Sequence, residues 1–166
     1  MKPEFISWLL EGDPSIRWQV QRDLLNSSPT KYEAERRKIA KVGWGARLLA
    51  LQDSSGRWGG GLYGPKWTST TYTMLTLRLL GLPPNNSQAK RACKLFLDEG
   101  FYTDGGINFF SYAWKYSEAC VTSMILALLA YFHYPDERIH SVASYLMGQQ
   151  MSDGGWNCES YKGATH

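Results

Sequence analysis

The chain is poor in cysteine and in charge. Its 166 residues include three cysteines, Cys93, Cys120 and Cys158, and an odd, sparse set of this kind does not form a disulfide framework. Charged residues make up 20% of the chain and the net charge is +3, which is too little to favour nucleic acid or an anionic membrane surface as a partner. Aromatic residues reach 14%, and this composition excludes disorder as the main interpretation.

Long apolar runs and common catalytic signatures are also missing. The N-terminal residues contain no apolar stretch of signal-peptide length. The longest apolar run, residues 124–132, has nine residues, half or less of a membrane span. With so few cysteines, which suits a reducing compartment, we expect a soluble cytoplasmic protein without a transmembrane segment. The chain contains no P-loop, no dinucleotide-binding glycine motif, no His-Glu-x-x-His and no Gly-x-Ser-x-Gly, so a nucleotide cofactor is not expected.

An internal repeat is the strongest feature that the sequence does have. A Gln-x-x-x-Gly-x-Trp element occurs twice, 98 residues apart, formed by Gln52, Gly56 and Trp58 and again by Gln150, Gly154 and Trp156. Midway between them Gly105 belongs to a degenerate copy, in which Ile107 replaces the tryptophan. A fixed period of 49 residues indicates a stack of helical hairpins.

Each repeat unit is predicted to be a helix, a glycine turn and a second helix. Residues 136–150 carry one apolar stripe with helical spacing, which is typical of a half-exposed outer helix, and residues 87–98 are similar. Residues 117–134 are apolar nearly all round, which predicts an inner helix buried on all sides. Residues 68–82 are its counterpart one unit earlier. The fold class is therefore all-α.

The chain is expected to have two parts. Residues 1–42 lack the repeat and include Asp13 followed by Pro14, a typical helix start. We expect this segment to be a helical cap on the first repeat, because a terminal repeat needs one, and residues 43–166 to form the repeat segment. By the period, a third inner helix would begin near His166. We therefore expect the chain to be a truncated part of a ring, or to cover its open end by self-association.

The Gln-x-x-x-Gly-x-Trp elements resemble the QW motifs of the terpenoid cyclase and protein prenyltransferase superfamily, typified by squalene–hopene cyclases. The resemblance covers about residues 44–166. It implies an α/α toroid, in which inner helices surround a central cavity and outer helices surround the inner ones. The expected fold is thus an incomplete α/α toroid of stacked helical hairpins.

The motif residues themselves suggest structural roles. The two glutamines fall in the last turn of an outer helix, where a side-chain amide can bond carbonyls that lack partners. The glycines allow the left-handed conformation that ends a helix. The tryptophans are expected to pack over the turn, with an indole N–H that needs an acceptor.

The resemblance implies an isoprenoid-handling enzyme domain, whose ligand is an isoprenoid or another apolar small molecule. The Asp-x-Asp-Asp cluster with which cyclases of the superfamily protonate an alkene is absent. Asp53, Asp104 and Asp153 each stand beside a turn glycine, where a turn or capping role is expected. No catalytic acid is therefore assigned.

A zinc site is the sharper implication of the resemblance. Protein prenyltransferases hold zinc with an Asp-x-Cys at the start of one inner helix and a histidine at the start of the next. The matching residues here are Glu118, Cys120 and His166, with glutamate in place of aspartate. Three such ligands and an open fourth position describe a catalytic zinc site, and a helix N-terminus would lower the pKa of the Cys120 thiol. Cys120 with Cys158 and His166 is a second grouping, and purely structural roles are a third.

Aromatic residues gather after the first two turns and near the inner-helix starts: Tyr63, Trp67, Tyr72, Phe109, Phe110, Tyr112, Trp114 and Tyr116. In the superfamily such rings line the cavity, and a ring face attracts a cation by about 0.5–2 kcal/mol. Trp67, Tyr72, Trp114 and Tyr116 are the candidate substrate-binding residues. The alternative is that the rings simply pack between the two layers of helices.

Two further functions are compatible with the sequence. One is a non-catalytic helical-repeat module that binds a lipid or a protein partner. The other is a carbohydrate-active toroid that stacks sugars on aromatic rings and uses a carboxylate such as Asp104 or Glu118.

Overall fold

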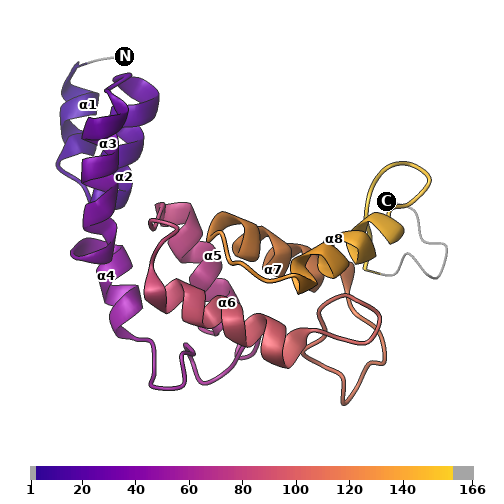
Figure 1. Cartoon of the computed structure of the whole chain (residues 1–166). Helices are drawn as coiled ribbons and strands as arrows, with labels where there is room; N and C mark the ends of the chain where they lie inside the picture. The colour runs from indigo at the N-terminus through magenta and orange to yellow at the C-terminus, as the bar shows by residue number, and fades with distance from the viewer. Residues whose placement is uncertain (1–2, 159–166) are drawn as a thin grey trace.

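The computed structural model describes residues 3–158, and these residues confirm an all-helical fold (Figure 1). No strand occurs among them, and the only extended pairings there are two isolated bridges. A π-helical turn at Val20–Leu24 follows α2, and a 3-10 turn at Arg37–Ala40 follows α3. The helices are α1 (Pro3–Leu10), α2 (Pro14–Gln19), α3 (Pro29–Arg36), α4 (Gly43–Ala50), α5 (Thr70–Leu80), α6 (Ser87–Gly100), α7 (Ala119–Tyr131) and α8 (Arg138–Gly148).

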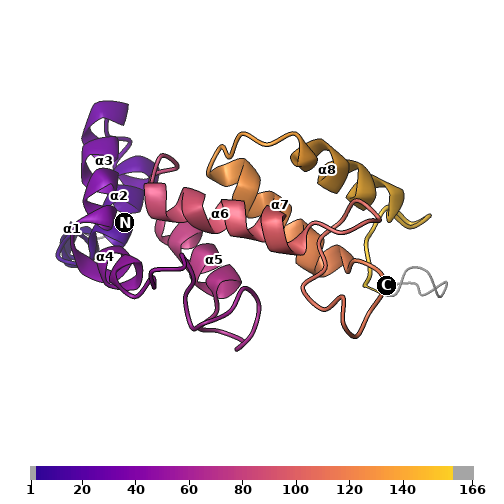
Figure 2. The same cartoon turned by 60° about the horizontal axis from the view of Figure 1, so that its bottom comes forward.

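Helices α1 to α3 form an arm at one end of the molecule, and α5 to α8 form the body (Figures 1 and 2). Within the body α7 is central, because it packs against α5, α6 and α8. Fully buried side chains such as Met74 on α5, Phe96 on α6 and Ile125 on α7 make up one continuous apolar core.

The glycine turns repeat with the predicted period. Gly56, Gly105 and Gly154 have φ values of 91°, 90° and 89°, a left-handed conformation that glycine adopts without steric cost. Each turn is closed by the same backbone hydrogen bond, from Asp53 to Arg57, from Tyr102 to Gly106 and from Met151 to Gly155, at 2.9, 3.0 and 2.9 Å. The backbone conformation therefore recurs at the spacing of the sequence repeat, and the degenerate middle copy keeps the geometry.

The motif glutamines hold the turn rather than the helix end. Gln52 donates its Nε2–H to the carbonyl of Gly56 at 2.9 Å, and Gln150 donates to the carbonyl of Gly154 at 2.8 Å. The prediction that these amides bond the free carbonyls of the preceding helix is therefore wrong. The turn leaves the glycine carbonyl within reach of the amide, and the helix carbonyl has a different partner.

That partner is the tryptophan. The indole Nε1–H of Trp58 donates to the carbonyl of Leu48 at 2.6 Å, and Trp156 donates to Leu146 at 2.6 Å. Both acceptors belong to the last turn of a helix, where carbonyls have no partner within the helix. The indole N–H thus finds the acceptor that it was expected to need, at the same place in both copies.

The helices α5 and α7 follow a different register from the turns. Thr70 accepts a hydrogen bond from the backbone N–H of Trp58, and Thr122 accepts the corresponding bond from Ile107, both at 3.1 Å. These two threonines lie further apart in the chain than the turn glycines do, because Thr70 is the first residue of α5, whereas Thr122 lies three residues after the start of α7. The difference is recovered in the next helix, since α6 has 14 residues and α8 has 11.

The prediction that residues 117–134 are buried on all sides is only partly right. Val121, Ile125 and Leu128 on α7 are fully buried, but Ser123 and Ala130 are exposed. Burial depends on the neighbours that a helix has, and α5, α6 and α8 leave part of the surface of α7 uncovered. Because α7 is apolar on all sides, its uncovered part is an apolar surface that is available for a further contact.

The N-terminal arm covers the C-terminal ends of α5 and α7. Trp18 donates its indole N–H to the carbonyl of Leu80 at 2.9 Å. Arg36 donates to the carbonyl of Gly81 at 2.7 Å and to the hydroxyl of Tyr131 at 2.9 Å. The guanidinium of Arg36 also lies 5.1 Å from the Trp18 ring centre, a cation–π arrangement. One arginine thus connects the arm to two helices of the body.

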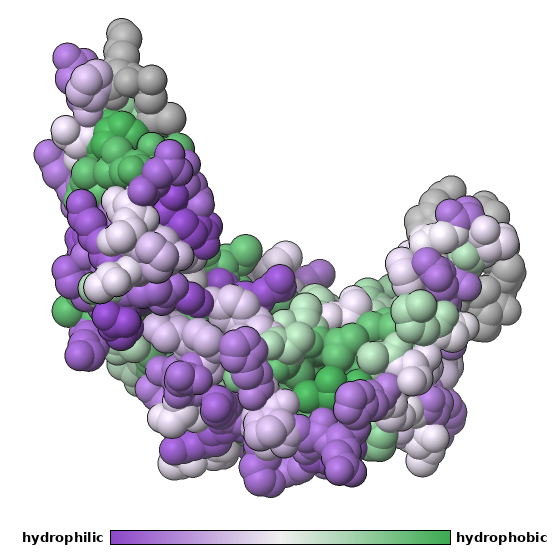
Figure 3. Space-filling model, turned by 45° about the horizontal axis from the view of Figure 1, so that its top comes forward, coloured by the Kyte–Doolittle hydropathy of each residue, from purple (hydrophilic) through white to green (hydrophobic). Residues whose placement is uncertain are grey.

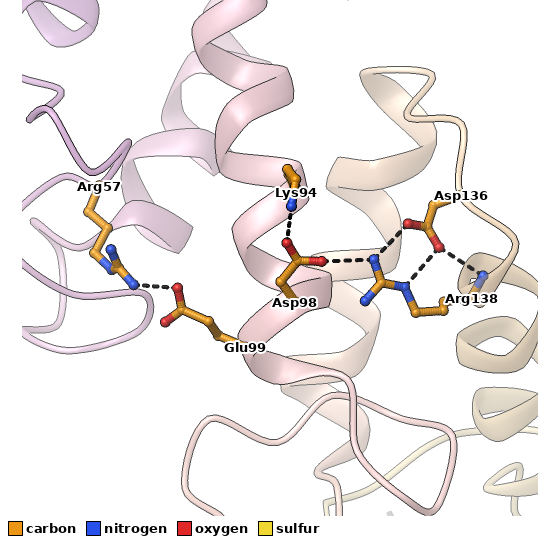
Figure 4. A network of polar contacts seen from close by, with 6 residues as sticks. All are labelled: Arg57, Lys94, Asp98, Glu99, Asp136 and Arg138. Atoms are coloured by element: carbon orange, nitrogen blue, oxygen red, sulfur yellow. Dashed lines mark hydrogen bonds and ion pairs between the residues drawn. The ribbon is translucent and has the colours of Figure 1, made fainter.

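Charged side chains connect α6 to the segments before and after it (Figure 4). Asp98 pairs with Lys94 on the same helix and with Arg138 at 3.0 Å, and Arg138 is also held by Asp136 at 2.7 Å. Exposed pairs of this kind each contribute little, on the order of 0–1 kcal/mol. They fix the position of α8 beside α6 rather than supplying most of the stability.

Replacing each motif tryptophan by phenylalanine tests the role of the indole bond. Trp58 is 2% exposed and Trp156 is 43% exposed, although both make the same bond. We expect Trp58→Phe to lower the free energy of unfolding by about 1–3 kcal/mol, because the indole hydrogen bond is lost and the smaller ring leaves space at a fully buried site. Water can replace the partner at the second site, so Trp156→Phe should cost less than about 1 kcal/mol. Urea unfolding followed by circular dichroism measures both, and equal losses would contradict this account.

Candidate functional site

The segment that leads into α7 is fixed by an aspartate. Asp104 accepts hydrogen bonds from the backbone N–H and the hydroxyl of Ser117, both at 2.7 Å, and from the N–H of Gly106 at 3.0 Å. Both carboxylate oxygens are therefore engaged in positioning the start of the helix. This is the turn and capping role predicted for Asp104, and it leaves the carboxylate poorly placed to act on a sugar.

Glu118 and Cys120 stand at the N-terminus of α7. Glu118 is the N-cap residue, but its side chain makes no capping hydrogen bond. The thiol of Cys120 forms a side-chain hydrogen bond with Cys158. Of the second predicted metal grouping, the structure thus brings together Cys120 and Cys158, whereas His166 lies outside the described residues.

The Cys120 thiol is not activated. Partial desolvation of its sulfur, the neighbouring Cys158 thiol and the negative charge of Glu118 raise the pKa of Cys120 to about 12, although the residue as a whole is exposed. The prediction that the helix N-terminus lowers this pKa is wrong, because desolvation disfavours the thiolate more strongly than the helix dipole favours it. At neutral pH the thiol stays protonated.

Tyr145 lies within electrostatic reach of the same charges. Its hydroxyl donates to the carbonyl of Ser117. Burial, together with the charges of Asp104, Cys158 and Glu118, raises the pKa of Tyr145 to about 12. Cys120 and Tyr145, which both lie near the N-terminus of α7, therefore stay protonated at neutral pH.

An apolar pocket of about 550 Å³ opens beside this cluster. Its walls come from α7, α8 and the third glycine turn. The residues that line it are Ala119, Cys120, Ser123, Leu126, Ala143, Leu146, Met147, Trp156, Asn157 and Cys158. The two thiols thus lie at the wall of a pocket whose other side chains are mainly apolar.

The predicted aromatic residues form two groups. Trp67 and Tyr72 contact each other with ring centres 5.2 Å apart, and Tyr63 extends this group, 5.5 Å from Tyr72. Trp114 and Tyr116 form a separate pair, 6.2 Å apart. Trp67 is 73% exposed, so packing between layers of helices does not account for it.

Helices α5 and α7 also share an uncovered face that the sequence pattern does not reveal. When Thr70 is aligned with Thr122, the positions that are at least partly exposed on both helices are Tyr72 and Met124, Leu75 and Ala127, Arg78 and Ala130, and Leu79 and Tyr131. We call this set the shared face. Leu79 is 76% exposed. Figure 3 shows apolar residues in the hollow between the N-terminal arm and the C-terminal part of the chain.

A metal site is not complete among the described residues. Within residues 3–158, no group of three or more His, Cys, Asp or Glu side chains is placed to hold a metal ion. Glu118 and Cys120 provide two of the three predicted ligands, and both are of a type that zinc binds. The third, His166, lies outside the part of the chain that the structure describes.

Thiol alkylation tests the state of Cys120. We expect its reaction with iodoacetamide to stay slow at pH 7 and to accelerate only well above pH 9, because the thiolate is the reactive form. Unfolding in urea should return the pH dependence to that of an ordinary cysteine. Peptide mass spectrometry follows each cysteine, with buried Cys93 as an unreactive control. A native reaction with an apparent pKa below 8.5 would contradict the structure.

No helix in the described residues has the length and apolar character needed to cross a bilayer. Comparison with family models, with curated proteins and with solved structures found no match. The residues and their geometry are therefore the only basis for assigning a function.

Proposed function

We propose that the chain is an isoprenoid-handling domain, related to terpenoid cyclases and protein prenyltransferases and forming part of an α/α toroid. In this proposal α5 and α7 are inner helices, whereas α4, α6 and α8 are outer helices. The ligand is a prenyl chain or a similar apolar small molecule. The domain is the catalytic type of unit rather than a passive repeat, although no catalytic residue is assigned.

The shared face is the observation that carries the proposal. A soluble helix normally turns its apolar positions toward a neighbour, but α5 and α7 leave equivalent positions uncovered. Leu75 and Leu79 on α5 and Ala127 on α7 are apolar and accessible. Repetition of the same open positions in two units indicates that one ligand surface runs across both helices.

The exposed aromatic group extends this surface at the N-terminal end of α5. Tyr72 belongs to the shared face, and Trp67 packs against Tyr72. The ammonium of Lys66 lies 5.0 Å from the Trp67 ring centre. An apolar chain along the helices would therefore end near a cation, which could pair with an anionic diphosphate head.

The size of the hydrophobic gain is adequate for a prenyl ligand. Each buried CH₂ contributes about 0.8 kcal/mol, so a fifteen-carbon chain can gain on the order of 10 kcal/mol before the costs of immobilisation. Those costs are about 4–15 kcal/mol, so most of the prenyl chain has to be buried for binding to be measurable.

Zinc belongs to the same proposal. Glu118 and Cys120 at the start of α7 and His166 beyond the described residues would hold the ion. A bound zinc would supply a thiolate or hydroxide at neutral pH. It would also remove the proton that burial keeps on Cys120, because a metal-bound thiol is deprotonated.

Binding of farnesol and farnesyl diphosphate tests the apolar surface. Leu79→Asn should weaken binding about fivefold or more, since a large apolar side chain contributes about 1.5–3 kcal/mol when fully buried. Leu51→Asn is the matched control, because Leu51 is similarly exposed, at 70%, and lies outside the shared face. Isothermal titration calorimetry measures both variants. Equal affinities for the two variants, or no binding at all, would contradict the proposal.

The same titration separates the carbohydrate alternative. Oligosaccharides that bind through exposed Trp67 and Tyr112, and are unaffected by Leu79→Asn, would indicate a sugar-binding surface instead. A prenyl-binding domain should give no heat with oligosaccharides under the same conditions.

Metal analysis tests the zinc ligands. We expect about one zinc per chain in the purified protein, a loss in Cys120→Ala and retention in Cys158→Ala. Loss in Cys158→Ala would point to the second grouping instead. Zinc below about 0.2 per chain, with no difference between the variants, would reject both metal sites.

A further inference from the structure

The apolar pocket between α7, α8 and the third glycine turn lies next to the shared face on α7, but no residue belongs to both. Ser123 and Leu126 of α7 line it, together with Leu146 and Met147 of α8. Met147 is 65% exposed. A surface of this apolar character that remains accessible usually marks an interaction site.

The repeat shows what covers the equivalent positions one unit earlier. When α7 is aligned with α5 so that Thr122 matches Thr70, Ser123 and Leu126 correspond to Thr71 and Met74. Both of these α5 residues are fully buried. When α8 is aligned with α6 so that Gly154 matches Gly105, Leu146 corresponds to Leu97, which is also buried. In that unit α7 packs against both α5 and α6. The pocket is thus the place that the next helix of the same type would occupy.

The third turn agrees with this correspondence. Trp58 in the first turn is almost completely buried, whereas Trp156, which makes the same indole bond, is partly exposed and lines the pocket. The first two turns are followed by α5 and α7, whose first-turn residues Thr70 and Thr122 bond the turn backbone.

We propose that this pocket is a docking site for one apolar α-helix of the α5 and α7 type, lying between α7 and α8 as α7 lies between α5 and α6. The docked helix is apolar on most sides, begins with a threonine or serine in its first turn, and is about three turns long.

This inference depends on the repeat geometry and not on the proposed function. The ligand surface of that function is the shared face, represented by Leu79, whereas the helix site is represented by Met147. A substitution at Leu79 therefore tests the proposed function, and a substitution at Met147 tests the helix-docking site, so that either proposal can fail without the other.

A synthetic peptide provides the test. The probe copies residues 69–82, which include α5, and carries a fluorescent label and two added C-terminal lysines for solubility. The control peptide is the same sequence with Leu77→Asp, because Leu77 is fully buried in the native contact. Fluorescence anisotropy measures binding to the full chain, and to its Met147→Asp and Leu79→Asn variants. Circular dichroism melting confirms that both variants are folded.

We expect the probe to bind the unmodified chain, the control peptide to bind at least tenfold more weakly, and Met147→Asp to weaken probe binding at least tenfold. Leu79→Asn should leave probe binding unchanged. Bound probe should also slow alkylation of Cys158, which lines the pocket.

Four results would overturn the inference. The probe and control peptides could bind equally well, or Met147→Asp could have no effect. Sedimentation could show that the chain forms dimers that Met147→Asp disrupts and that the probe does not, which would make a second copy the occupant. Farnesol could protect Cys158 where the probe does not, which would make the pocket a small-molecule site.

Discussion

The glycine turn is the constraint on which the rest of the structure depends. Its left-handed residue can be only glycine without strain, and the space around it is equally restrictive. A Cβ at Gly56 would lie 2.7 Å from the side chain of Arg91 on α6, and one at Gly105 would lie 2.7 Å from the hydroxyl of Ser141 on α8. The first two turns therefore fix both the chain direction and the distance to the next outer helix, whereas a Cβ at Gly154 in the third turn would meet no atom within 4 Å.

The tryptophan and the glutamine complete this turn from opposite sides. Gln52 bonds the glycine carbonyl and Trp58 bonds the helix before it, so the helix end and the turn form one unit. The middle copy lacks both side chains but keeps the backbone geometry, with Ile107 fully buried in place of the tryptophan. Backbone conformation and apolar packing are thus sufficient there, and the side-chain bonds reinforce the first and third turns.

The features that sequence predicted well are those set by local chemistry. The spacing of the turns could be predicted because a left-handed position demands glycine. The capping role of Asp104 could be predicted because an aspartate beside a turn glycine commonly accepts hydrogen bonds from the turn backbone. Asp13 caps α2, with the N–H of Ser15 2.9 Å from its carboxylate. The apolar composition of residues 117–134 predicted a helix buried on all sides; the helix is present as α7, but only part of its surface is buried.

Features set by neighbours were missed or predicted wrongly. The exposed positions of α7 depend on which helices surround it, and the protonated state of Cys120 depends on the desolvation that those helices cause. The shared face escaped notice because the turns suggested one register for the whole repeat, whereas α5 and α7 correspond at a longer spacing. Only hydrogen bonds such as that from Ile107 to Thr122 reveal the shift.

The difference in register has a consequence for how such an architecture can diversify. The residues gained in the first turn of α7, ahead of Thr122, are given up in α8, so the third turn stays in phase with the first two. In a duplicated unit, the exposed side chains of the inner helix can therefore shift along the helix axis by nearly one turn, while the glycine turns and outer helices keep their spacing. The depth at which side chains meet a bound molecule can change by short insertions in one layer, compensated by short deletions in the other.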